Sequence, residues 1–264
     1  MPISILNSWM TDHDMVPDTP DVVLPLLFKW WSGFERGRTY LGDAGLGKSV
    51  LVNRVAGELL AEGDLVAGPL RLARGRDPIA ALADALTPLV ATGERMATRV
   101  EHAVSRVREV GLWGARIAVE ASADDRYAGL AELLAALAAH AADTDRLLVI
   151  RVDEVQNLSG APLSQLLTLL GDVLEMRLAA TDVTGAAVEQ YAPVAVLLSG
   201  LPHFPQRASG AGATFSRRFA TTYLEPFTDQ EVRAALVFAF NDGFEVSPTR
   251  GHNWSVYRRP LVKN

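Results

Sequence analysis

The sequence predicts an α/β fold in which a parallel sheet of five strands lies between two layers of helices. Short, mostly apolar runs, typical of strands buried on both faces, alternate with segments whose leucines and valines recur at helical spacing. The 264 residues are 49% hydrophobic, which is ample for one large core. A glycine-rich loop between the first strand and the first helix completes the pattern.

The predicted strands and helices alternate along the chain, as in successive βαβ units. Pro78 marks the start of one helix, because proline suits the first helical turn. The segment 94–120 has charges of both signs around apolar residues at helical spacing; we interpret it as a solvated amphipathic helix or, alternatively, as a partner-binding helix. Strands are expected at 38–41, 65–72, 147–154, 194–200 and 220–224, and further helices near 51–60, 79–89, 130–137, 163–174 and 229–240.

The loop after the first strand matches the phosphate-binding P-loop motif. Its glycines let consecutive backbone N–H groups point at phosphate oxygens, while Lys48 reaches the β- and γ-phosphates and the Ser49 hydroxyl binds Mg²⁺. A nucleoside triphosphate is therefore the predicted ligand. ATP is favoured over GTP because the guanine-reading Asn-Lys-x-Asp motif is absent from the sequence. The predicted ligand-binding residues are Gly42, Asp43, Ala44, Gly45, Leu46, Gly47, Lys48 and Ser49.

Two acidic residues end the apolar strand at 147–154. The carboxyl ends of parallel strands form the edge at which α/β sheets bind their ligands, so these acids are expected near the phosphates. We predict that Asp153 joins Ser49 in holding Mg²⁺ with its water shell, and that Glu154 polarises the water that attacks the γ-phosphate.

Composition excludes several other classes of site. The formal net charge of −6 gives no overall basic field, so DNA binding is possible but unsupported by charge. The absence of cysteine excludes disulfides, thiol catalysis and cysteine-type zinc sites. No signal peptide and no apolar run long enough for a membrane helix is visible, so a cytoplasmic protein without membrane contact is expected.

With these motifs in this order, the chain resembles the AAA+ ATPase superfamily over residues 36–240. Within it, the similarity is to bacterial origin-recognition-like ATPases and to ATPase subunits of transposition and secretion systems. The resemblance implies that Ser199, at the end of the fourth strand, contacts the γ-phosphate, and that Arg218, or less clearly Arg217, enters a neighbouring subunit's site. A strand-end hydroxyl and an ordinary surface charge are the alternative interpretations.

The residue pattern and the resemblance together suggest how the chain is divided; the leader is expected from its prolines and aromatic residues. Residues 1–35 are expected to form a leader that packs on the core, and 36–227 the P-loop ATPase domain. Residues 228–264 are expected to form a partial lid and tail, because only one helix follows where such ATPases continue into a helical lid.

The sequence thus predicts an ATP-binding, Mg²⁺-dependent ATPase of AAA+ type that acts with a protein partner or by self-assembly. The incomplete lid leaves two alternatives open. One is a nucleotide-dependent interaction switch that does not hydrolyse ATP, and the other is a truncated, inactive relative.

Overall fold

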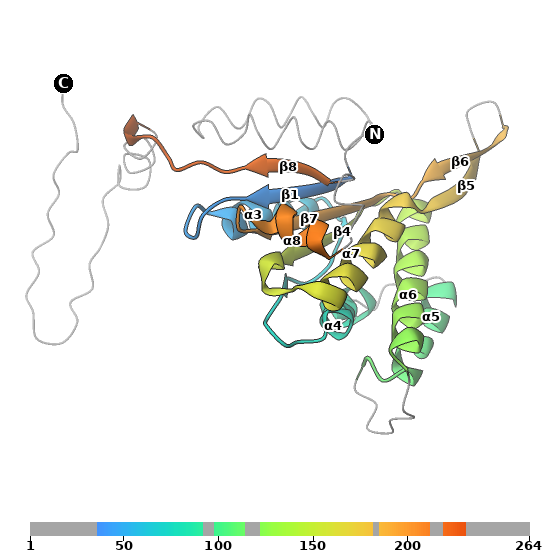
Figure 1. Cartoon of the computed structure of the whole chain (residues 1–264). Helices are drawn as coiled ribbons and strands as arrows, with labels where there is room; N and C mark the ends of the chain where they lie inside the picture. The colour runs from blue at the N-terminus through green and yellow to red at the C-terminus, as the bar shows by residue number, and fades with distance from the viewer. Residues whose placement is uncertain (1–35, 92–97, 114–121, 182–184, 212–218, 231–264) are drawn as a thin grey trace, which may run out of the picture. The chain divides into compact units, whose positions relative to one another are not determined.

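The described part of the chain forms a parallel sheet with helices on its faces (Figure 1). The strands are β1 (Gly37–Leu41), β2 (Leu65–Val66), β3 (Leu70–Arg71), β4 (Leu148–Asp153), β7 (Val194–Gly200) and β8 (Phe219–Tyr223), in the order β2-β4-β7-β1-β8. β3 also pairs with β4, so β2 and β3 together occupy one edge position. This computed structural model describes residues 36–91, 98–113, 122–181, 185–211 and 219–230.

The parallel sheet with five strand positions predicted from the sequence is confirmed. β7 and β1, in the interior of the sheet, are buried along their whole length. Burial on both faces explains the mostly apolar sequence of β7, whereas β1 also buries Arg38 and Thr39. The second predicted strand, 65–72, is broken in the structure. Gly68 donates its N–H to the carbonyl of Ala85 on a helix at 2.7 Å, and Pro69 has no N–H to donate, so the ladder to β4 is interrupted there.

The helices lie on both faces of the sheet, as the chain direction requires. The connection from β1 to β2 crosses the sheet in one direction. The connections from β3 to β4, from β4 to β7 and from β7 to β8 cross it in the opposite direction. Because such crossovers are right-handed, α3 (Lys48–Ala61) lies on one face and the later helices on the opposite face. These later helices are α4 (Pro78–Ala91), α6 (Ala123–Asp143), α7 (Gly160–Glu175) and α8 (Phe204–Gly210).

An additional helix, α5 (Thr98–Glu109), confirms the amphipathic segment predicted within 94–120. It packs on α6 and buries Val100, Ala103 and Val107 while its charged side chains are exposed. This arrangement agrees with the interpretation as a solvated amphipathic helix.

A two-stranded antiparallel hairpin projects from the sheet between α7 and β7 (Figure 1). It consists of β5 (Arg177–Thr181) and β6 (Ala187–Tyr191), and the sequence analysis did not predict it. All five residues of β6 are exposed. The guanidinium groups of Arg36 and Arg177 lie 3.7 Å and 4.4 Å from the ring centre of Tyr191.

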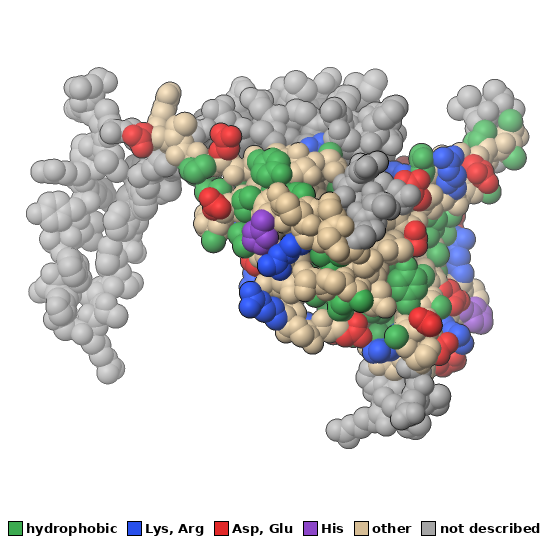
Figure 2. All heavy atoms as spheres, viewed as in Figure 1, with side chains coloured by type: hydrophobic (Ala, Val, Ile, Leu, Met, Phe, Trp, Pro, Cys, Tyr) green, Lys and Arg blue, Asp and Glu red, His purple; other side chains and the backbone are tan. Residues whose placement is uncertain are grey.

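Several predictions fall outside the described residues. These are the leader at 1–35, the residues Arg217 and Arg218, and most of the expected helix and tail after Asp229. None of the helices in the described ranges has the length and hydropathy needed to cross a membrane. On the face shown in Figure 2, basic and acidic side chains are mixed.

Candidate nucleotide-binding site

The P-loop connects the carboxyl end of β1 to the first turn of α3, as the sequence predicts. Gly45 and Gly47 have φ angles of +88° and +81°, in the left-handed region that glycine adopts without strain. Gly47 caps α3 without a side-chain hydrogen bond, and the first turn contains no acidic residue. The backbone N–H groups at this helix end are therefore available to an anionic ligand.

The loop starts between the ends of two other strands. The N–H of Gly42 donates to the carbonyl of Gly200 on β7 at 3.3 Å, and Leu224, just after β8, donates its N–H to the carbonyl of Leu41 at 2.7 Å. A Cβ atom on Gly42 would lie 3.0 Å from the carbonyl oxygen of Leu224. A residue without a side chain is thus needed where the chain leaves β1.

Lys48 lies over the loop that precedes it. Its ammonium donates to the carbonyl oxygens of Gly42 at 2.8 Å and Asp43 at 2.7 Å. These contacts hold the cation beside the N–H groups of the loop, where phosphate oxygens would meet both.

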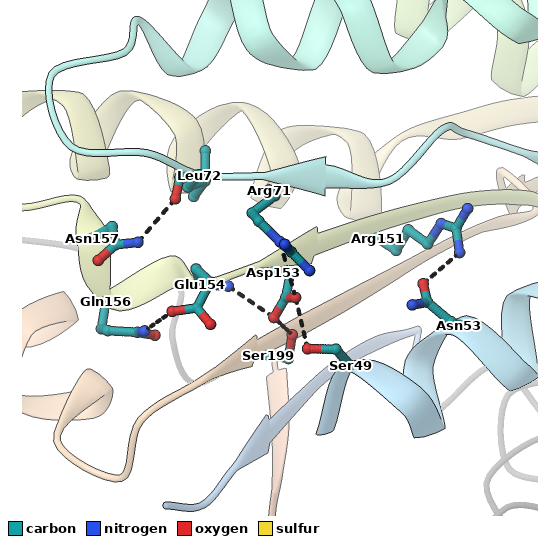
Figure 3. Close-up of polar contacts among 10 residues, drawn as sticks. All are labelled: Ser49, Asn53, Arg71, Leu72, Arg151, Asp153, Glu154, Gln156, Asn157 and Ser199. Atoms are coloured by element: carbon teal, nitrogen blue, oxygen red, sulfur yellow. Dashed lines mark hydrogen bonds and ion pairs between the residues drawn. The ribbon is translucent and has the colours of Figure 1, made fainter. Parts of the chain in front are cut away.

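Asp153 connects the loop to the neighbouring strand ends (Figure 3). Ser49 donates its hydroxyl to Asp153 Oδ2 at 2.7 Å, and Ser199, fully buried at the end of β7, donates to Oδ1 at 2.6 Å. The N–H of Glu154 donates to the same Oδ1 at 3.0 Å. From β3, Arg71 places its Nε 3.9 Å from Asp153 Oδ2. Three predicted site residues, Ser49, Asp153 and Ser199, therefore lie in one cluster.

The oxygen atoms of Ser49 and Asp153 suit Mg²⁺. This ion prefers oxygen ligands and is usually bound by one or two carboxylates together with substrate phosphates and several waters. Within the described ranges, no group of three or more His, Cys, Asp or Glu side chains could hold a metal. The donor set therefore fits an ion that is bound together with a nucleotide better than one enclosed by protein side chains alone.

Glu154 stands at a sharp bend after β4. Its backbone is left-handed, with φ 62° and ψ 37°, and it leads into a short 3₁₀ turn, η1 (Val155–Asn157). Its carboxylate does not point at Ser49 but accepts a hydrogen bond from Nε2 of Gln156 (Figure 3). The sequence analysis did not single out Gln156, nor Arg71, although Gln156 lies two positions after the predicted catalytic glutamate.

The sheet behind the loop is tied to α3 by a half-buried arginine. Arg151 of β4 donates from Nη1 to Asn53 Oδ1 at 2.8 Å and from Nε to the carbonyl of Ala67 at 3.3 Å. Burial lowers the pKa of Arg151. On β1, burial raises the pKa of Tyr40 to about 12, so its hydroxyl stays protonated at neutral pH.

Comparison with known proteins gives structural neighbours alone. No protein-family model matches the chain, and no curated protein matches it. The chain is similar to the Orc1 protein of Aeropyrum pernix, solved in complex with DNA, at 15% identity and a TM-score of 0.43 over 87% of this chain and 52% of that one. It is also similar to Cdc6p of Pyrobaculum aerophilum, at 14% identity and a TM-score of 0.43 over 90% of this chain and 52% of that one. The chain thus spans about half the length of either structure.

Proposed function

We propose that this chain binds ATP with Mg²⁺ at the P-loop and hydrolyses it. The observation that carries the proposal is the 2.7 Å hydrogen bond between Ser49 and Asp153, which are 104 positions apart in the sequence. It brings the hydroxyl of the phosphate-binding motif to the acidic end of β4, as the two motifs together require.

Each residue of the cluster has a role that follows from its chemistry. Lys48 and the N–H groups of the loop bind the β- and γ-phosphates, and Ser49 and Asp153 hold Mg²⁺. When bound, Mg²⁺ neutralises charge that develops on the phosphate oxygens. Glu154 orients the attacking water and polarises it, and Ser199 contacts the γ-phosphate from the end of β7.

The order of the motifs also supports an AAA+ type of ATPase. In that class, a partner protein or a second copy of the chain responds to the nucleotide, and we extend this expectation to the present protein. Contact with DNA is not part of the proposal, because the net charge is −6 and acidic and basic side chains are mixed on the face in Figure 2.

ATP binding is tested by thermal unfolding with and without Mg-ATP. The wild-type protein is expected to gain stability with ATP, because a ligand that binds only the folded state raises the unfolding temperature. Lys48→Ala is expected to lose this gain, whereas Arg54→Ala, which removes an exposed pair with Glu58 on the same helix, is expected to keep it. An equal gain in the Lys48→Ala protein would contradict the assignment of the loop.

Hydrolysis is tested by phosphate release from the same proteins. Glu154→Gln is expected to bind ATP as the wild type does and to lose turnover, because the amide keeps the shape and loses the charge. If the wild type binds ATP without turnover, with or without DNA, the protein is a nucleotide-dependent switch and not an ATPase.

A further inference from the structure

Gln156 is buried beside Glu154 and uses both polar atoms of its side chain. Its Nε2 donates to Glu154 Oε2, and its Oε1 accepts the N–H of Leu201 at 3.2 Å (Figure 3). Only 8% of the residue is exposed. Because an amide nitrogen can only donate and an amide oxygen can only accept, these two partners fix which way the carboxamide points.

The backbone of Gln156 is fixed as well. Its carbonyl oxygen accepts Nη1 of Arg207 on α8 at 2.7 Å. A Cβ atom on Gly200 would lie 3.0 Å from Gln156 Oε1 and 2.7 Å from Val155 Cγ2. The carboxamide therefore has room against the end of β7 because residue 200 is a glycine.

We propose that Gln156 is a positioning residue for Glu154, setting the orientation of the carboxylate that acts on the attacking water. This inference rests on the proposed function. The hydrogen bond from Gln156 holds Oε2, which restricts the otherwise flexible glutamate side chain and orients its second oxygen for the water.

Hydrogen bonds from the end of β7 thus orient both acidic side chains, Asp153 and Glu154. Ser199 donates directly to Asp153, and Leu201, two residues later, reaches Glu154 through Gln156. The metal-binding and water-polarising carboxylates are thus oriented from one strand end. A carboxylate held in this way needs no rearrangement in the reaction, which is the advantage of a preorganised site.

A buried glutamine could also act through packing alone, so the test separates the two roles. Gln156→Met keeps the length of the side chain and its apolar contacts but removes both the donor to Glu154 and the acceptor for the N–H of Leu201. Turnover and ATP affinity are measured for the full chain with Gln156→Met, with Glu154→Gln and with both. Gln190→Met, on the exposed strand β6, is the matched control.

We expect kcat to fall about 10- to 100-fold in Gln156→Met, with the affinity for ATP unchanged. The double variant is expected to be no slower than Glu154→Gln, because Gln156 acts only through the carboxylate that this variant lacks. Gln190→Met is expected to match the wild type.

Three results would overturn the positioning role: wild-type turnover in Gln156→Met, a parallel loss of ATP affinity, or a further loss of rate in the double variant. If Gln156→Met does not fold, Gln156→Asn replaces it, because its shorter side chain cannot span Glu154 and Leu201. A Glu154→Gln protein as active as the wild type would contradict the role of Glu154 and with it the positioning role of Gln156. Failure of the proposed function is distinguished by a wild-type protein that neither binds nor hydrolyses ATP.

Discussion

At the scale of single residues, Glu154 has a left-handed backbone, which among the described non-glycine residues Asp145 shares. A residue with a side chain costs about 1–2 kcal/mol in this conformation, and the structure contains it where β4 turns towards η1. Two hydrogen bonds hold the bend: its N–H donates to Asp153 Oδ1, and Asn157 donates its N–H to the carbonyl of Glu154 at 2.9 Å. The bend that places the Glu154 carboxylate therefore strains the backbone locally.

This strain predicts an inverted order of stability for two substitutions. Glu154→Gly is expected to be more stable than Glu154→Ala by about 1 kcal/mol, because glycine adopts the left-handed conformation without the steric cost of a Cβ atom. Both variants are expected to lack turnover. Urea unfolding measures the difference. The control pair is Glu58→Gly and Glu58→Ala within α3, where the opposite order is expected; the same order at both positions would refute a strained Glu154.

At the scale of secondary-structure elements, buried strands could be predicted from the sequence and the exposed strand β6 could not. β4 and β7 were predicted because they are largely buried and mostly apolar. The hairpin of β5 and β6 was missed because all of β6 is exposed and its residues do not alternate in hydrophobicity. The break in the strand at 65–72 was missed although Gly68-Pro69 is a local turn signal. The hydrogen bond from Gly68 to α4 depends on the fold and is not visible in the sequence.

Among the site residues, some could be predicted from sequence motifs and others could not. The P-loop, Asp153 and Glu154 follow from motifs whose spacing reflects their chemistry, and Ser199 follows from the family resemblance. Arg71 and Gln156 could not be predicted, because their roles depend on which strand ends become neighbours and on where each side chain points.

Asp64, in the turn between α3 and β2, is expected to make the folding stability depend on pH. Asp64 accepts the N–H of Leu147 at 2.8 Å and so joins this turn to the start of β4. Burial raises the pKa of Asp64 above its usual value, although the hydrogen bond from Leu147 opposes the shift. The folded state therefore binds the proton more tightly than the unfolded state, and this contribution to stability is lost as pH rises through the folded pKa.

Asp64→Asn removes the ionisation and keeps an oxygen that can accept the N–H of Leu147. Relative to this variant, the wild-type protein is expected to gain stability as the pH falls from 7 to about 4. Urea unfolding at several pH values measures the difference between the two proteins. A difference that stays constant with pH, or that grows in favour of the variant as pH falls, would exclude a raised pKa.

At the scale of the whole molecule, the action of Arg218 on a neighbouring subunit stays a prediction, because this residue lies outside the described ranges. Phe219, the next residue in the chain, pairs with Gly37 at the start of β1, whereas the P-loop follows the other end of β1. A strand of five residues separates the two ends by about 13–16 Å. The chain therefore enters β8 at the opposite end of the strands from its own P-loop.

If Arg218 completes a neighbour's site, two inactive variants should restore activity when they are mixed. Lys48→Ala subunits keep Arg218 and Arg218→Ala subunits keep an intact P-loop, so a mixed assembly contains some complete sites. Because an arginine supplied in trans is worth about 10³ to 10⁵ in rate, partial recovery is expected to be measurable as phosphate release.

A mixture of Lys48→Ala with Glu154→Gln is the control and is expected to stay inactive, since each subunit lacks a residue of its own site. A protein that remains monomeric with ATP, or unchanged turnover in Arg218→Ala, would leave Arg218 as an ordinary surface charge.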